Sequence, residues 1–133
     1  MSHVGDMWAA DDASRALGME LVEAGDGSAI VRMTVRDDMV NGHRMAHGGL
    51  VATLADSAFA VACNSHGVLT VAAGFDVTFL RPARLGDVLT ATAVERVRLG
   101  RSGICDVTVA TGDGDVVAEF RGRSRELPVQ GDG

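Results

Sequence analysis

The chain contains no lysine and no tyrosine, only one tryptophan and only two cysteines among its 133 residues. Two cysteines, Cys63 and Cys105, cannot build a disulfide framework, so we expect both to be reduced core residues of a cytoplasmic protein. The scarcity of aromatic rings and the net charge of −6 argue against a nucleic-acid partner. No apolar run approaches the length of a membrane span, and the acidic N-terminal stretch is unlike a signal peptide, so no membrane partner is expected.

An apolar content of 47% over 133 residues is sufficient for a hydrophobic core, and no linker or repeat divides the chain. We therefore predict one domain over residues 1–133, with loose ends at about 1–5 and 128–133. All twelve basic residues are arginine, and eight of them lie between Arg81 and Arg125. Arginine forks suit phosphate groups, although for any single arginine an exposed surface position is the simpler interpretation.

Apolar spacing predicts a short helix over residues 6–17, strands over 19–24 and 29–36, and a long helix from Gly48 to Asn64. Four further strands are predicted over 69–79, 88–99, 104–111 and 116–125, the last two joined by a hairpin at Asp113-Gly114. In the first of these four, strict alternation predicts one face made of Leu69, Val71, Ala73, Phe75, Val77 and Phe79.

A single helix that is apolar almost all round belongs in the middle of a core. With this many strands, it predicts an α+β fold in which one antiparallel sheet curls around one long central helix. One helix cannot cover both faces of such a sheet. We therefore expect a second subunit to cover the outer face or an edge.

One carboxylate, Asp56, interrupts the apolar surface of the long helix. Spacings of three and four place it on a narrow stripe of small and polar side chains, which consists of Thr53, Asp56, Ser57, Ala60 and Asn64. A carboxylate in such a place is costly unless it is paired or used in chemistry. Spacing alone leaves two hypotheses open: a reactive group, or a carboxylate that pairs with an arginine or faces a solvated cleft.

His47, Gly48 and Gly49 stand at the start of the same helix. The first N–H groups of a helix lack internal partners and carry the positive end of its dipole, and glycines let a ligand oxygen approach them closely. This arrangement is typical of an oxyanion hole, and a tight helix entry is the alternative interpretation. His43 and His47 lack the glutamate of a zinc-protease motif, so no metal site is expected.

The segment from Asn41 to Asn64 and the order of the predicted elements resemble the hotdog-fold acyl-CoA thioesterases. The resemblance is to the PaaI-like (phenylacetic acid degradation) branch of the 4-hydroxybenzoyl-CoA thioesterase superfamily, and it spans about residues 17–125. The residues that carry it are Asn41, His47 to Gly49, Leu54 to Ala60, Cys63 to Ser65, Phe79 to Pro82 and Gly86-Asp87. It implies an enzyme whose antiparallel sheet is wrapped around the long helix.

The resemblance also implies roles for individual residues. Asp56 matches the family's catalytic carboxylate, acting as nucleophile or as general base for water, and the Gly48 N–H matches the group that polarises the thioester carbonyl. Asn41 and His47 match polar positions near the thioester or the attacking water, and Gly49 lies beside the substrate. Gly48 and Asp56 usually come from opposite subunits in such proteins, which implies a homodimer that builds the site, commonly within a homotetramer. No cofactor is implied, because coenzyme A is part of the substrate.

One position departs from the family pattern. Some relatives place a Ser or Thr hydroxyl on the strand after the helix, where this chain has Ala72-Ala73-Gly74, so Thr70 or Asn41 is expected to position the water. The phosphates of coenzyme A need cations. The arginines at predicted strand ends and turns that we expect to bind these phosphates are Arg81, Arg84, Arg98 and Arg101.

The implied reaction is hydrolysis of an acyl-CoA thioester to the free acid and coenzyme A, with phenylacetyl-CoA or hydroxyphenylacetyl-CoA as the preferred substrate. A medium- or long-chain fatty acyl-CoA is the second alternative, because that branch shares the same residues. A hotdog dehydratase ranks third, since it usually pairs a catalytic histidine with its acid. A non-catalytic acyl-CoA-binding module would keep the pocket without depending on Asp56.

Overall fold

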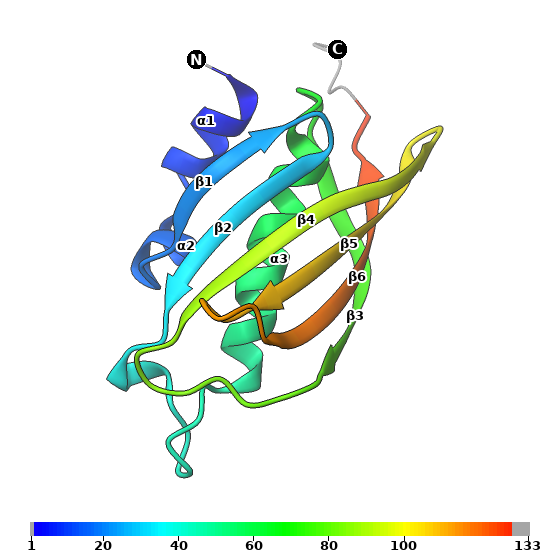
Figure 1. Ribbon diagram of the computed structural model, residues 1–133. Helices are drawn as coiled ribbons and strands as arrows, with labels where there is room; N and C mark the ends of the chain where they lie inside the picture. Colours follow the sequence, from blue (N-terminus) through cyan, green and yellow to red (C-terminus); the bar gives the residue numbers. More distant parts are fainter. Residues whose placement is uncertain (1, 129–133) are drawn as a thin grey trace.

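The computed structural model describes residues 2–128, in which one six-stranded antiparallel sheet curls around helix α3 (Gly48–Asn64) (Figure 1). The order of strands across the sheet is β1-β2-β4-β5-β6-β3. This arrangement confirms the predicted α+β layout. The strands are β1 (Glu20–Gly25), β2 (Ser28–Thr34), β3 (Thr70–Phe79), β4 (Val88–Leu99), β5 (Ser102–Ala110) and β6 (Val116–Glu126), with a 3-10 turn η1 (Asp37–Met39) after β2.

Helix α3 is buried where it faces the sheet, as its apolar sequence predicts, and Leu54 and Phe59 are at most 1% exposed. Strands β4, β5 and β6 alternate buried and exposed residues along much of their length, so each turns an apolar face toward the helix. The Phe59 ring lies directly against Gly122 of β6, where a Cβ would be only 2.7 Å from ring carbons. Glycine at this position therefore allows the helix and the sheet to approach closely.

The alternation predicted for β3 is wrong over its first half. Between Ala72 and Gly74 the register against β6 shifts by one residue, which is the mark of a β-bulge. Phe75 therefore lies opposite Gly122 on the inner face, whereas Val71 lies opposite the exposed Arg125 on the outer face. The sequence pattern does not reveal the extra residue, because apolar residues continue to alternate through it.

Two short helices, α1 (His3–Ala9) and α2 (Asp12–Ala16), replace the single opening helix that the sequence predicts. The helix breaks at Asp11 because the Asp11 carboxylate accepts the Ser14 N–H and so caps α2. Residues 3–5, expected to be loose, form the first turn of α1. Most of the expected loose C-terminal end, residues 129–133, lies outside the described residues.

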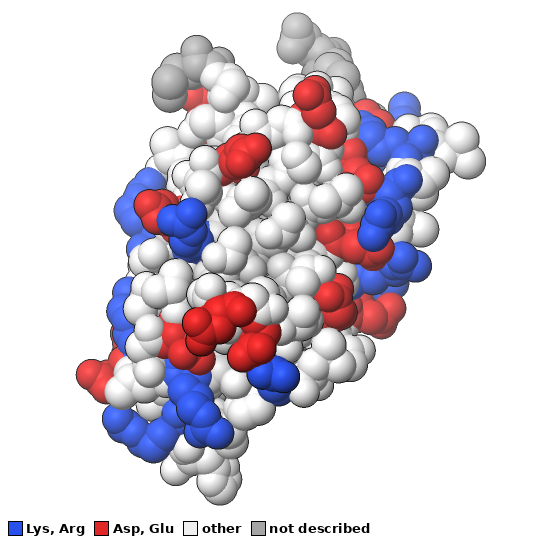
Figure 2. Space-filling view, in the orientation of Figure 1, with Lys and Arg blue, Asp and Glu red and all other residues white. Residues whose placement is uncertain are grey.

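The outer face of the sheet carries paired charges. Arg96 and Arg121 both bind Asp106, at 3.0 and 2.7 Å, and Arg123 binds Asp76 at 3.0 Å. Figure 2 shows arginines next to acidic side chains, rather than gathered into one basic surface, on the side in view. The hydrogen bond from Arg121 is the main reason that the pKa of Asp106 is lowered to about 2.

Strand β3 forms one edge of the sheet. Large apolar side chains on this strand and on the segment after it are 40–59% exposed, namely Val71, Phe75, Phe79, Leu80 and Leu85. An exposed apolar edge of this kind is typical of an interface. Cys63 and Cys105, in contrast, are free and buried as predicted. None of the helices within residues 2–128 has the length and apolar character needed to cross a membrane.

Candidate active site

The loop before α3 is shaped by Asn41. Its side-chain oxygen accepts the N–H groups of His43 and Met45, and its own N–H donates to the Met45 carbonyl. This local turn leads the chain into His47, which is the N-cap of α3. Leu50 and Val51 donate their N–H groups to the His47 carbonyl, so the N–H groups of Gly48 and Gly49 are the ones at this helix start that are available to a ligand.

A cleft of about 300 Å³ opens at this end of α3. Its walls come from the loop before the helix, the first turns of α3 and the segment that follows β3, and they include Asn41, Met45, Gly48, Val51, Phe79, Leu80 and Arg81. The Phe79 ring lies so close to Gly48 that a Cβ would come within 3.1 Å of it. The structure therefore brings Asn41, Gly48 and Arg81 to one cleft, while His47 and Gly49 are exposed on either side of Gly48 in the chain.

Asp56 is half-buried on α3, and it takes part in none of the ion pairs of residues 2–128. The hypothesis that it pairs with an arginine is therefore wrong for this protomer. Burial raises the pKa of the Asp56 carboxyl, and the nearby charge of Asp11 raises it further. A carboxylate with a raised pKa is a better proton acceptor near neutral pH, so this environment suits a general base.

Gly48 and Asp56 are eight residues apart on one straight element, which corresponds to about 12 Å along the helix axis. Groups that act on the same carbonyl must each come within about 3–3.5 Å of it. One protomer therefore does not bring the Gly48 N–H and the Asp56 carboxylate to the same thioester. In agreement, Asp56 is absent from the residues that line the cleft.

The N-terminal segment contacts the polar stripe on α3, which the sequence pattern does not predict. Ser14 Oγ lies 2.8 Å from Ser57 Oγ, and His3 Nε2 lies 2.8 Å from Asn64 Oδ1. The polar stripe is the sequence feature that could have indicated such contacts, because buried hydroxyl and amide groups need hydrogen-bond partners. Two of its members are thus bound to the N-terminal segment, whose Asp11 acts electrostatically on Asp56.

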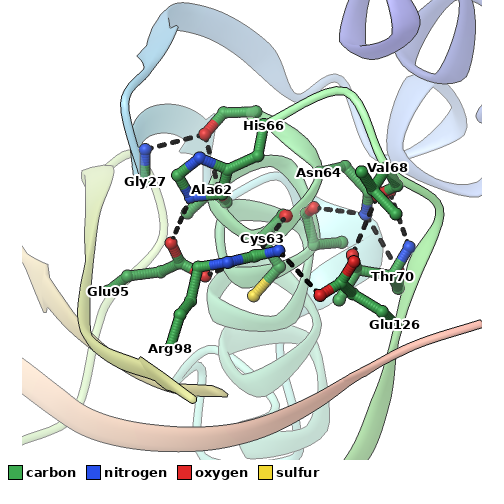
Figure 3. Close-up of polar contacts among 12 residues, drawn as sticks. Gly27, Ala62, Cys63, Asn64, His66, Val68, Thr70, Glu95, Arg98 and Glu126 are labelled. Atoms are coloured by element: carbon green, nitrogen blue, oxygen red, sulfur yellow. Dashed lines mark hydrogen bonds and ion pairs between the residues drawn. The ribbon is translucent and has the colours of Figure 1, made fainter. Parts of the chain in front are cut away.

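Thr70 lies beside Asn64 at the C-terminal end of α3 (Figure 3), whereas the cleft opens at the N-terminal end. Its N–H donates to Asn64 Oδ1 and its hydroxyl donates to the Val68 carbonyl, so both donors are already occupied. The structure does not bring Thr70 to Gly48. Of the two residues expected to position water, Asn41 is the one that lines the cleft.

The four arginines expected to bind coenzyme A divide between the two ends of the molecule. Arg81 lines the cleft and pairs with Asp115 at 3.0 Å, and Arg84 is exposed in the turn that follows. Arg98 and Arg101 lie near the β4–β5 hairpin, toward the C-terminal end of α3 (Figure 1). Within one protomer, only the first two are close to the candidate site.

Arg98 belongs to a cluster of ion pairs at the C-terminal end of α3 (Figure 3). It binds Glu95 at 3.3 Å and Glu126 at 3.2 Å, and Glu95 also binds His66 at 2.5 Å. The Glu95 side chain is only 8% exposed, so this cluster ties β4 to the helix end. The Arg98 guanidinium is occupied by these carboxylates. In residues 2–128, this cluster included, no three His, Cys, Asp or Glu side chains gather in a metal-binding arrangement.

Residues 43–118, from the loop before α3 into β6, match the model of a family described as the thioesterase superfamily. The chain belongs to the thioesterase superfamily. The matched range contains the helix start at Gly48, the carboxylate Asp56 and the arginine Arg81 at the cleft. The predicted hotdog fold and the predicted class of enzyme, a thioester hydrolase, are both confirmed.

This member of the thioesterase superfamily is similar to the acyl-coenzyme A thioesterase PaaI of Escherichia coli, with 42% identity over 121 residues that cover 91% of this chain and 86% of that one. The solved structure of the E. coli PaaI protein from the phenylacetic acid degradation operon has a TM-score of 0.93 at 40% identity and covers 95% of this chain and 91% of that one. A Streptococcus mutans protein solved with bound acetyl-CoA has a TM-score of 0.79 at 26% identity, and the match covers 82% of this chain and 88% of that one.

Proposed function

We propose that this chain hydrolyses acyl-CoA thioesters to the free acid and coenzyme A. The observation that carries the proposal is a helix start with free N–H groups at an apolar cleft, together with a half-buried carboxylate on the same helix whose pKa is raised. Similarity to an acyl-coenzyme A thioesterase along 91% of the chain supports the same chemistry.

In the proposed reaction, the Gly48 N–H donates to the thioester oxygen, on which negative charge develops as the carbonyl carbon is attacked. Asp56, acting as general base, takes a proton from the attacking water. The C–S bond of the tetrahedral intermediate then breaks, and the sulfur of coenzyme A leaves with the proton that Asp56 held. Acting instead as nucleophile, the Asp56 carboxylate would attack the carbonyl carbon and displace coenzyme A as its thiolate, which leaves a mixed anhydride. Water would then hydrolyse the anhydride to the free acid and the Asp56 carboxylate, and the thiolate would take up the proton that this step releases. Asn41 in the cleft, and His47 beside it, are proposed to position the carbonyl or the water.

We propose that two protomers build each site, with Gly48 from one and Asp56 from the other. The separation of about 12 Å along α3 requires a second source for one of the two groups. The exposed apolar side chains of edge strand β3 supply a surface on which a second copy can pack. The homotetramer implied by the family resemblance is an extension of the same proposal.

The proposed substrate is phenylacetyl-CoA or hydroxyphenylacetyl-CoA, which would give the chain a role in phenylacetate degradation. The support is the similarity to the E. coli PaaI protein, whose operon serves phenylacetic acid degradation. The cleft lining of Met45, Val51, Phe79 and Leu80 suits an apolar group, and Arg81 can meet a phosphate. The same apolar lining also accommodates fatty acyl chains, which makes a medium- or long-chain acyl-CoA the second candidate.

The test is release of the coenzyme A thiol, measured by thiol titration with phenylacetyl-CoA, hydroxyphenylacetyl-CoA and a series of fatty acyl-CoA thioesters. The wild type is compared with Asp56→Asn, which keeps the size of the side chain and removes the base. We expect a loss of about 10²–10⁴ in kcat, the usual contribution of acid–base catalysis, with an unchanged fold by circular dichroism.

The outcomes separate the alternatives. Preference for aryl substrates and loss of turnover in Asp56→Asn support the proposal, whereas preference for fatty acyl chains keeps the mechanism and changes the substrate. Binding of acyl-CoA without turnover in the wild type would identify a non-catalytic binding module. Hydrolysis by Asp56→Asn at the wild-type rate would contradict the proposed role of the carboxylate.

A further inference from the structure

A second carboxylate, Asp11, lies near Asp56 and is not used in the proposed reaction. Its Oδ1 accepts the Ser14 N–H at 2.9 Å, and its Oδ2 accepts the Ser14 hydroxyl at 2.6 Å. Ser14 is 2% exposed, and its Oγ also lies 2.8 Å from Ser57 Oγ on α3. Since Ser14 gives its only hydroxyl proton to Asp11, Ser57 is the donor in the second bond. Two consecutive hydrogen bonds therefore connect α3 to Asp11: Ser57 donates to Ser14, and Ser14 donates to Asp11.

These two hydrogen bonds fix the position of Asp11 relative to α3. The two hydroxyl groups are buried, so movement of α2 away from α3 would leave polar groups without partners. Ser57 directly follows Asp56 in the helix, so the contact holds the Asp11 carboxylate at the part of α3 that carries Asp56. The negative charge of Asp11 acts on Asp56 across this contact and adds to the effect of burial on the Asp56 pKa.

The other charged groups around α3 face elsewhere. On the N-terminal segment, Asp12 pairs with Arg15 in solvent, and His3 binds Asn64 two turns further along the helix; Asp6 lies on α1. Glu95, Arg98, Glu126 and His66 meet each other at the helix C-terminus. The remaining charges of the strands packed on α3 lie on the outer face of the sheet, among them Glu20, Glu23, Arg32, Asp76, Arg96, Asp106, Glu119, Arg121, Arg123 and Arg125.

We propose that Asp11 is a positioning residue, which the Ser14–Ser57 contact holds so that a fixed negative charge stands beside Asp56 and makes it a stronger base. The inference rests on the proposed function of Asp56. Capping of α2 does not by itself require a charge at this position, because Asn, Ser and Thr cap helices as well. Repulsion between two neighbouring carboxylates favours uptake of a proton by one of them, and Asp11 is the one whose oxygens already accept two hydrogen bonds.

The test uses Asp11→Asn, which removes the charge and keeps an oxygen that can accept from Ser14. Asp12→Asn is the matched control, because it removes an adjacent, 93% exposed carboxylate. Two quantities are measured on the whole chain of residues 1–133: the titration of the Asp56 carboxyl by carbon-13 NMR, assigned with Asp56→Asn, and the pH profile of kcat/KM. The NMR titration needs no substrate, so it decides the inference even where no thioester is hydrolysed.

We expect the Asp56 pKa, and with it the acid limb of kcat/KM, to move to lower pH in Asp11→Asn and to stay in place in Asp12→Asn. The sign follows because removal of a negative neighbour makes ionisation of Asp56 easier. An Asp56 titration in Asp11→Asn that matches the control overturns the inference and leaves the proposed function intact. A shifted titration without thioesterase activity in the wild type keeps the electrostatic link and removes the proposed function.

Discussion

The contact between Gly122 and Phe59 gives the most sharply defined prediction about how α3 is held in the sheet. In Gly122→Ala the new Cβ would lie 2.7–2.8 Å from three carbons of the Phe59 ring. Normal carbon contacts are about 3.5–4.0 Å, so the ring or the strand must move by roughly 1 Å. The ring has little room, because it is 1% exposed and its centroid lies 5.7 Å from that of Phe120.

Such overpacking costs about 1–3 kcal/mol. For a chain of this length, that loss corresponds to a decrease in Tm of roughly 4–12 °C. The assay is thermal unfolding at one fixed protein concentration, because association of subunits also stabilises the folded state. Gly112→Ala is the matched control, since nothing lies within 4 Å of its added Cβ.

The Gly112→Ala control should stay within about 0.5 kcal/mol of the wild type. A double variant combines Gly122→Ala with Phe59→Leu. Because leucine is smaller than the phenylalanine ring that the new Cβ would meet, the double variant should recover part of the stability lost in Gly122→Ala. Equal Tm values for Gly122→Ala and Gly112→Ala would refute the close approach of α3 to β6.

Three further predictions concern charge and assembly. Since the pKa of Asp106 is lowered to about 2, chiefly by the hydrogen bond from Arg121, its contribution to stability is present above about pH 4 and disappears as the pH falls toward 2. Acid unfolding of Asp106→Asn should lack this part of the pH dependence, and an unchanged acid profile would contradict the pairing. Glu95→Gln should lower the free energy of unfolding by about 1–3 kcal/mol in urea titrations, because it removes the charge that Arg98 binds and replaces one of the two acceptor oxygens with an NH2 donor. A loss of stability no larger than that caused by neutralising an exposed carboxylate would contradict a stabilising role of the cluster. On dilution, the activity per protomer should fall as the dimer dissociates in analytical ultracentrifugation, and full activity in a monomer would remove the shared site.

The sequence predicts the long helix and the strands well because their apolar periodicity is local and strong. The bounds of α3, from Gly48 to Asn64, agree with the prediction. Two local features are not predicted from the sequence. Asp11 can continue a helix or cap one, and a bulge at Ala73 inserts one residue without a turn signal of its own.

Parts of the candidate site depend on contacts that no local pattern encodes. The sequence points to Asp56 and Gly48, because an isolated carboxylate and a glycine-containing helix start are visible in one short segment. It does not reveal that Asp11 acts on Asp56 or that Arg98 also binds Glu126, since the residues of each pair are tens of residues apart and meet only in the folded chain.

The separation of Gly48 and Asp56 on α3 suggests an unusually specific test of the shared site. Gly48 is the first residue of the helix, where proline is well tolerated, and His47 before it has φ −62° and ψ 127°, as proline requires of its neighbour. Gly48→Pro therefore removes the N–H with little change in the backbone. Gly48→Ala is the control, because it adds the same Cβ near Phe79 and keeps the N–H.

The most direct measurement is the thioesterase activity of mixed oligomers of Gly48→Pro and Asp56→Asn, each of which the proposed mechanism predicts to be inactive alone. In a mixed dimer, one site would combine the intact Gly48 of one protomer with the intact Asp56 of the other. Random mixing should then restore about one quarter of the wild-type activity per protomer. No recovery in proven mixed oligomers would contradict the claim that two protomers share each site.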